Sequence, residues 1–135
     1  MNYQEALAWI HSIGRFGMNQ GLQRIKKLLS YLGDPHKKLN FLHIGGTNGK
    51  GSTAAFAAAV LEAAGYRVGL YTSPYLEKFT NRMAINGQDI TPERLVELVK
   101  KVKPFVEEIA ADPLCGHPTE FEVVTALALT YFAQE

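Results

Sequence analysis

A glycine-rich stretch between an apolar segment and an Ala-rich segment constrains this chain more than any other feature. The apolar segment is Leu39–Gly45, and the Ala-rich one runs to Ala64, before Gly65. Between them stand Gly46, Thr47, Asn48, Gly49, Lys50, Gly51, Ser52 and Thr53. Glycines let a backbone approach a phosphate closely because they carry no Cβ, and a following helix adds its positive N-terminal dipole. The order therefore predicts a strand, a phosphate-binding loop and a helix.

The side chains of this stretch suit the phosphates of a nucleotide. Lys50 supplies a mobile cation for the β- and γ-phosphates, and Ser52 or Thr53 supplies a hydroxyl for Mg²⁺. The stretch departs twice from the usual pattern G-x-x-x-x-G-K-[ST], because Ile44 stands at the first glycine position and Gly51 follows the lysine. An exposed lysine in a glycine-rich connection is the alternative interpretation.

Helices are predicted before this stretch, and a second strand after it. Apolar residues at helical spacing predict helices over Tyr3–Ile13 and Leu22–Leu32, separated by the loop Gly14–Gly21. Tyr66–Thr72 reads as the second strand. A strand, a helix and a strand in this order predict a parallel βαβ unit over residues 39–72 with a right-handed crossover, preceded by leading helices in residues 1–38.

The second half of the chain is predicted to contain a small hairpin and two helices. Asn86-Gly87 is a tight-turn pair, so a hairpin or bulge is expected within Arg82–Ile90. Thr91-Pro92 marks a helix start, and Pro104 must kink or divide that helix. After a further loop, Thr119 opens the last helix.

Composition excludes several classes of protein. The chain has 135 residues, 47% of them hydrophobic, and a net charge of +1, which gives no electrostatic footprint for nucleic acid or an anionic membrane. The single cysteine, Cys115, cannot form an internal disulfide and fits a reducing compartment. Thr53–Ala64 is shorter than the roughly 20 apolar residues that span a bilayer. We expect a cytoplasmic protein without nucleic-acid or membrane partners.

The motifs together resemble one known family. Gly-Thr-Asn-Gly-Lys-Gly-Ser resembles the phosphate-loop variant of the Mur ligase superfamily, and glycine after the lysine resembles its folylpolyglutamate synthase/dihydrofolate synthase branch. Other segments that resemble this branch are Gly21-Leu22-Gln23-Arg24, Leu32-Gly33-Asp34-Pro35, Thr72-Ser73-Pro74-Tyr75-Leu76, Arg82 and Thr119-Glu120-Phe121-Glu122.

This resemblance implies a fold and a reaction. The fold would be α/β, a P-loop-containing three-layer domain with a parallel sheet of the Mur ligase central-domain type. Residues 1–135 would be the N-terminal part of the ATP-binding domain, without the C-terminal glutamate ligase domain, so we expect an incomplete chain that is inactive alone. The family uses ATP to convert a carboxylate to an acyl phosphate, which L-glutamate attacks. The acceptor is folate, or dihydropteroate in bifunctional members, and the full-length protein is expected to be a monomer.

The resemblance also implies site residues. Ser73 and Glu122 would bind Mg²⁺ together with Ser52, and Tyr75 and Arg82 would contact the pterin or carboxylate substrate. Each has a structural alternative: Ser73 as a turn residue, Arg82 as a surface arginine, and Glu122 as the partner of Thr119 in a capping box.

Two other functions remain open at this stage. A non-catalytic ATP-binding module would need only the phosphate loop. A Mur-type ligase for a peptidoglycan precursor would share Gly46–Lys50, but it is not expected to combine Gly51 with the leading segment Gly21–Pro35.

Overall fold

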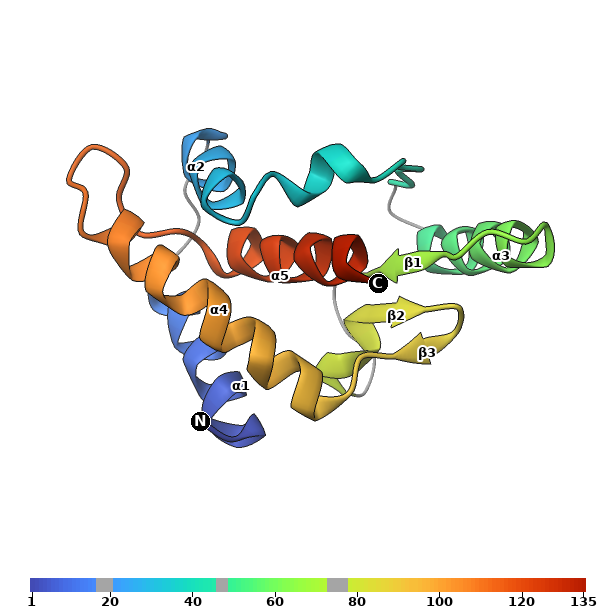
Figure 1. Ribbon diagram of the computed structural model, residues 1–135, viewed down its shortest axis with the longest axis horizontal. Helices are drawn as coiled ribbons and strands as arrows, with labels where there is room; N and C mark the ends of the chain where they lie inside the picture. Colours follow the sequence, from blue (N-terminus) through green and yellow to red (C-terminus); the bar gives the residue numbers. More distant parts are fainter. Residues whose placement is uncertain (17–20, 46–48, 73–77) are drawn as a thin grey trace. The chain divides into compact units, whose positions relative to one another are not determined.

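The computed structural model describes residues 1–16, 21–45, 49–72 and 78–135 (Figure 1). The chain forms two units. The helical unit comprises Met1–Leu39 and Pro92–Glu135, and the sheet unit comprises Asn40–Thr91.

The helical unit contains four α-helices and two short 3₁₀ helices among the described residues. They are α1 (Tyr3–Ser12), η1 (Ile13–Phe16), α2 (Gln23–Tyr31), η2 (Pro35–Lys38), α4 (Pro92–Ala110) and α5 (Glu120–Gln134). The helices predicted from apolar spacing are thus confirmed.

Local capping explains where two of these helices begin. The Asn2 side chain accepts a hydrogen bond from the backbone N–H of Glu5, whose carboxylate accepts one from the N–H of Asn2. Thr119 and Glu122 make the same reciprocal pair at the start of α5. Both pairs satisfy backbone donors that a helix leaves unpaired at its N-terminus.

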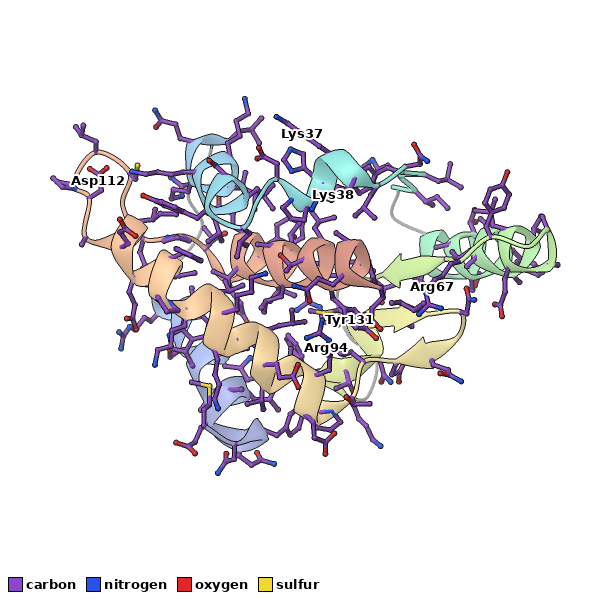
Figure 2. All side chains as sticks on the ribbon, viewed as in Figure 1. Lys37, Lys38, Arg67, Arg94, Asp112 and Tyr131 are labelled. Atoms are coloured by element: carbon purple, nitrogen blue, oxygen red, sulfur yellow. The ribbon has the colours of Figure 1, made fainter. Side chains whose placement is uncertain are left out.

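Helix α5 lies at the centre of the helical unit. It packs against α1, α2, α4 and η2, and Figure 1 shows it passing between α2 and α4. Buried residues occur on most of its circumference, as expected for a helix that is covered on several sides. They are Glu122, Val123, Val124, Ala126, Leu127, Ala128, Thr130 and Tyr131. The guanidinium of Arg94 on α4 lies 6.0 Å from the centre of the Tyr131 ring (Figure 2).

Helix α4 continues through its internal proline. Pro104 lies inside Pro92–Ala110, so the alternative in which it divides the helix is wrong. One apolar face holds α4 in the unit, and its buried residues are Leu95, Leu98, Val99, Val102, Val106 and Ile109. Burying such a face stabilises the helix enough to tolerate the loss of one backbone donor at the proline.

The sheet unit consists of α3 (Lys50–Ala63), β1 (Gly69–Tyr71), η3 (Phe79–Arg82), β2 (Met83–Ile85) and β3 (Gln88–Asp89). All pairing is antiparallel in the order β1-β2-β3, with Gly69 opposite Ile85 and Ile85 opposite Gln88. Asn86 and Gly87 join β2 to β3 with φ values of 48° and 79°, which are those of a type I′ turn. The predicted hairpin is therefore confirmed.

The predicted parallel βαβ unit is absent from the described residues. Leu39–Gly45 pairs with no strand among the described residues, and β1 pairs with β2 in the antiparallel sense. The physical reason lies in which strand pairs with β1. β2 follows β1 closely along the chain and pairs with it, whereas β1 has no strand paired on its other edge among the described residues. The coarser prediction of an α/β chain holds.

Helix α3 contributes little to the core of the sheet unit. It contacts β1, but Phe56 and Val60 are 74% and 66% exposed. Its inner face and the strands border a groove of about 220 Å³, lined by Ala55, Ala58, Ala59, Glu62, Val68, Leu70, Ala84, Asn86 and Gly87. Neither α3 nor any other helix in the described part of the chain has the length and apolar character that crossing a membrane requires.

Candidate functional site

The N-terminus of α3 carries the local geometry that an anion-binding loop needs. Gly49 is the N-cap with φ of 74°, a left-handed conformation that favours glycine. Among the described residues no side chain caps this end, and the N–H of Thr53 bonds the carbonyl of Gly49 at 2.9 Å to start the helix. The N–H groups of the first turn and the positive end of the helix dipole therefore stand available for a phosphate.

The described residues of the first turn are open to solvent. Gly51, Ser52 and Thr53 are all exposed. A Cβ at Gly51 would meet nothing within 4 Å, so packing within the described residues does not require glycine there. The two hydroxyls are the hard oxygen donors that Mg²⁺ prefers, and they fit the predicted metal role in chemical type.

Several predicted site residues lie outside the described residues or the described side chains. Gly46, Thr47, Asn48, Ser73 and Tyr75 fall in residues 46–48 and 73–77. The backbone of Lys50 begins α3, and its side chain is outside the description. Their predicted roles therefore stay predictions.

Arg82 is buried, not exposed. Only 7% of its surface is accessible, so the alternative of a surface arginine is wrong. Its guanidinium lies 5.7 Å from the ring centre of Tyr71 and 5.5 Å from that of Phe79. It also donates hydrogen bonds to the carbonyl of Thr72 at 3.3 Å and to the hydroxyl of Tyr71 at 3.4 Å. These contacts tie Arg82 to the carboxyl end of β1.

Glu122 forms the capping box that the sequence offered as its alternative role. Its Oε1 accepts the backbone N–H of Thr119 at 2.9 Å and the Nε–H of Arg24 at 3.0 Å. Arg24 and Glu122 are 5% and 8% exposed, so this is a buried ion pair. A carboxylate oxygen engaged by two donors and a guanidinium charge is a poor metal ligand, and the geometry favours a structural role. Metal binding by Glu122 stays a prediction.

Sequence reasoning did not single out Arg24. Its guanidinium joins α2 to the start of α5, and its Nη1 also donates to the carbonyl of Cys115 at 3.4 Å. The signal was present in the sequence, because Arg24 stands four residues before Leu28 and so lies on the face of α2 that is buried. A charged residue at such a position indicates a buried partner of opposite charge.

The loop between α4 and α5 has its own electrostatic anchor. Asp112 accepts the N–H of Leu114 at 2.9 Å and the ammonium of Lys27 at 3.1 Å (Asp112 is labelled in Figure 2). The Leu114 N–H, and next Lys27, hold the pKa of Asp112 below its ordinary value. The hydrogen bond to Asp112 raises the pKa of Lys27. The pair therefore favours the charged forms of both side chains.

Within the described ranges, no three His, Cys, Asp or Glu side chains gather as a metal-binding group. This leaves open a site built from hydroxyls, phosphates and water, which Mg²⁺ commonly uses.

Comparison with known proteins gives close matches over nearly the whole chain. The chain is 48% identical to the dihydrofolate synthase/folylpolyglutamate synthase of Bacillus subtilis over 132 residues, which cover 98% of this chain and 30% of that protein. The folylpolyglutamate synthetase structure from Lactobacillus casei superimposes with a TM-score of 0.89 at 44% identity, covering 99% of this chain and 34% of the other. A folylpolyglutamate synthetase complex with an ATP analogue (AMPPCP) and folate superimposes equally well, with a TM-score of 0.89 at 42% identity over 99% of this chain and 33% of the other. No family model matches the chain.

These matches define the fold as Mur ligase-like. Within that class, the predicted resemblance to the folylpolyglutamate synthase/dihydrofolate synthase family is confirmed. The chain spans about a third of the length of the relatives that it matches.

Proposed function

We propose that the protein to which this chain belongs is an ATP-dependent ligase that adds L-glutamate to folate. The observation that carries the proposal is the start of α3, where left-handed Gly49 of the glycine-rich sequence is the N-cap and no described side chain caps the helix. The similarity to dihydrofolate synthase/folylpolyglutamate synthase over 98% of the chain supports the choice of substrate. Dihydropteroate is a second acceptor in this proposal. The protein would act in the cytoplasm as a monomer.

The chain's own part in this reaction is to hold the phosphates of ATP. The backbone N–H groups of the first turn of α3 would bind phosphate oxygens, and Lys50 would neutralise the charge of the β- and γ-phosphates. Residues Gly46–Asn48 would complete the cradle. Phosphoryl transfer to the carboxylate of folate depends mainly on such positioning and charge neutralisation.

A magnesium ion fits the residues that the structure does describe. Ser52 and Thr53 present exposed hydroxyls on the first turn of α3, and Ser73 would add another oxygen. When bound, Mg²⁺ would supply neutralisation of the charge on the transferred phosphoryl group. We place Ser52 and Ser73 in this role, and Glu122 stays a candidate to be tested separately.

The parallel sheet belongs to the same proposal. We infer that Leu39–Gly45 forms a strand when further strands of a longer protein accompany it. Phe41 and Leu42 are 63% and 67% exposed here, which is unusual for apolar side chains of a predicted central strand. Amide hydrogen exchange of Leu39–Gly45 should be slow in a full-length protein and fast in residues 1–135. Equal, fast exchange in both would contradict the inference.

Calorimetric titration with Mg·ATP tests the phosphate site directly. Binding should be lost in Lys50→Ala and retained in Lys37→Ala, a matched control whose lysine belongs to η2 of the helical unit. Binding that survives in Lys50→Ala would refute the role assigned to Lys50. Absence of binding in residues 1–135 but not in a longer protein would show that the cradle needs further segments.

Substrate-dependent ATP turnover separates the ligase from the other functions. The full-length protein should form ADP only when folate, or dihydropteroate, and L-glutamate are both present. ATP binding without such turnover would favour a non-catalytic module, and turnover with a peptidoglycan precursor would favour the other ligase class. Residues 1–135 alone should form no ADP.

A further inference from the structure

The side chain of Arg82 contacts Tyr71, Thr72 and Phe79 in the sheet unit. Its guanidinium lies 5.7 Å from the ring centre of Tyr71 and 5.5 Å from that of Phe79. Two of its N–H groups donate to the carbonyl of Thr72 and to the hydroxyl of Tyr71. A planar guanidinium can stack on aromatic faces and donate in its own plane at the same time, which an ammonium group cannot.

The main chain of Arg82 reinforces the same connection. Its carbonyl accepts the N–H of Thr72 at 3.0 Å, one residue beyond the last ladder pair, Tyr71 opposite Met83. Thr72 is therefore held on both its N–H and its carbonyl by one residue. β1 itself has only three residues, Gly69–Tyr71.

We propose that Arg82 is a positioning residue that fixes the carboxyl end of β1, and that it serves the metal-dependent step without contacting folate. The inference rests on the proposed function, since Ser73, bonded directly to Thr72, is one of the proposed metal ligands. It replaces the expectation, drawn from family resemblance, that Arg82 binds a substrate carboxylate. A guanidinium already committed to two aromatic rings and two oxygens of β1 is suited to hold a strand end.

The first readout is structural and needs no ligand. In full-length protein, Arg82→Lys keeps the charge but loses the planar fork, so exchange of the Thr72 amide should accelerate about tenfold or more, as local opening of the strand end becomes easier. Arg67→Lys is the matched control, because Arg67 is an exposed arginine of the same unit (labelled in Figure 2). It should leave this exchange rate unchanged.

The second readout separates positioning from substrate contact. The Mg²⁺ concentration for half-maximal rate should rise about 10-fold or more in Arg82→Lys, the range seen when residues that orient metal ligands are changed. The KM for folate should change less than about threefold, because Arg82 does not contact folate in this proposal. Loss of a substrate contact contributing about 1.4 kcal/mol would instead raise the KM about tenfold. Arg67→Lys should alter neither quantity.

The outcomes distinguish this inference from the proposed function. If the unchanged protein forms no ADP in the presence of folate and glutamate, the proposed function is refuted. Amide exchange of Thr72 still tests whether Arg82 holds the end of β1. If the protein is active, a tenfold rise in the KM for folate in Arg82→Lys with unchanged Mg²⁺ dependence overturns the inference. The inference is also overturned if neither the KM for folate nor the Mg²⁺ dependence changes. If Arg82→Lys does not fold, Tyr71→Phe removes only the hydroxyl. Unchanged Thr72 exchange and unchanged Mg²⁺ dependence in Tyr71→Phe then overturn the inference.

Discussion

Replacing Glu122 by alanine should destabilise the helical unit more than any other single change at its polar residues. The substitution removes the acceptor of the Thr119 N–H and leaves the guanidinium of Arg24 buried without its carboxylate. Removing one partner of a buried ion pair costs about 3–5 kcal/mol. For a unit of about 60–100 residues, each kcal/mol lowers the midpoint temperature by roughly 4–8 °C. The expected fall is therefore at least about 12 °C.

Glu122→Gln divides this effect into its parts. The amide oxygen can still accept both hydrogen bonds, but the guanidinium of Arg24 loses its opposite charge. The expected loss is therefore smaller than the about 3–5 kcal/mol for alanine, because the buried donors stay hydrogen-bonded. The same variant tests the metal role, because Mg²⁺ dependence of ATP binding that stays unchanged in Glu122→Gln would argue against ligation.

Urea unfolding followed by the fluorescence of Trp9 is the appropriate assay. Trp9 is the single tryptophan of the chain and lies on α1, in the same unit as Arg24 and Glu122. Glu120→Ala is the control, since Glu120 stands two positions earlier and pairs with His11 at the surface. Exposed pairs contribute about 0–1 kcal/mol. If Glu122→Ala loses no more stability than Glu120→Ala, the burial argument is wrong.

Two further predictions concern the surface loop and the hairpin. Because the folded-state pKa of Asp112 is lowered, its stabilising contribution is present above the ordinary value of 3.8 and disappears as pH falls through the lowered pKa. Urea unfolding from pH 7 to pH 3 should therefore show a smaller loss of stability in Asp112→Asn than in the unchanged chain, and equal losses would refute the assignment. Gly87→Ala places a side chain at φ of 79° and should cost about 1–2 kcal/mol in amide-exchange stability of β2, whereas an effect below the measurement error would exclude strain at this turn.

Most of the features that the sequence predicted correctly depend on interactions between residues that are close together in the chain. The helix starts at Thr119 and Thr91-Pro92 and the turn at Asn86-Gly87 were predictable, because each depends on a few adjacent residues. The competition between capping and metal binding at Glu122 was also foreseeable, since Thr119-x-x-Glu122 is a local pattern. The structure decided the part of this question that concerns capping.

Partners distant in the sequence were the part that could not be predicted. The residues around Arg24 in the sequence do not indicate that its partner is Glu122. The residues of Tyr66–Thr72 likewise do not indicate which strand β1 pairs with. Short apolar runs such as Leu39–Gly45 predict a strand only on condition that a neighbour exists. The roles proposed for Ser73, Tyr75 and Lys50 depend in the same way on groups that a local pattern does not fix.

The helical unit is made from two stretches of chain, with all of Asn40–Thr91 between them. During synthesis, α1 and α2 leave the ribosome long before α4 and α5, although both of these later helices pack against them. Their apolar faces therefore stay exposed to solvent while the sheet unit is synthesised. At about 5–20 residues per second this delay lasts several seconds, a period in which unpaired apolar surface invites aggregation or chaperone binding. The order of the segments therefore makes the burial of the first helices depend on α4 and α5, which are synthesised later.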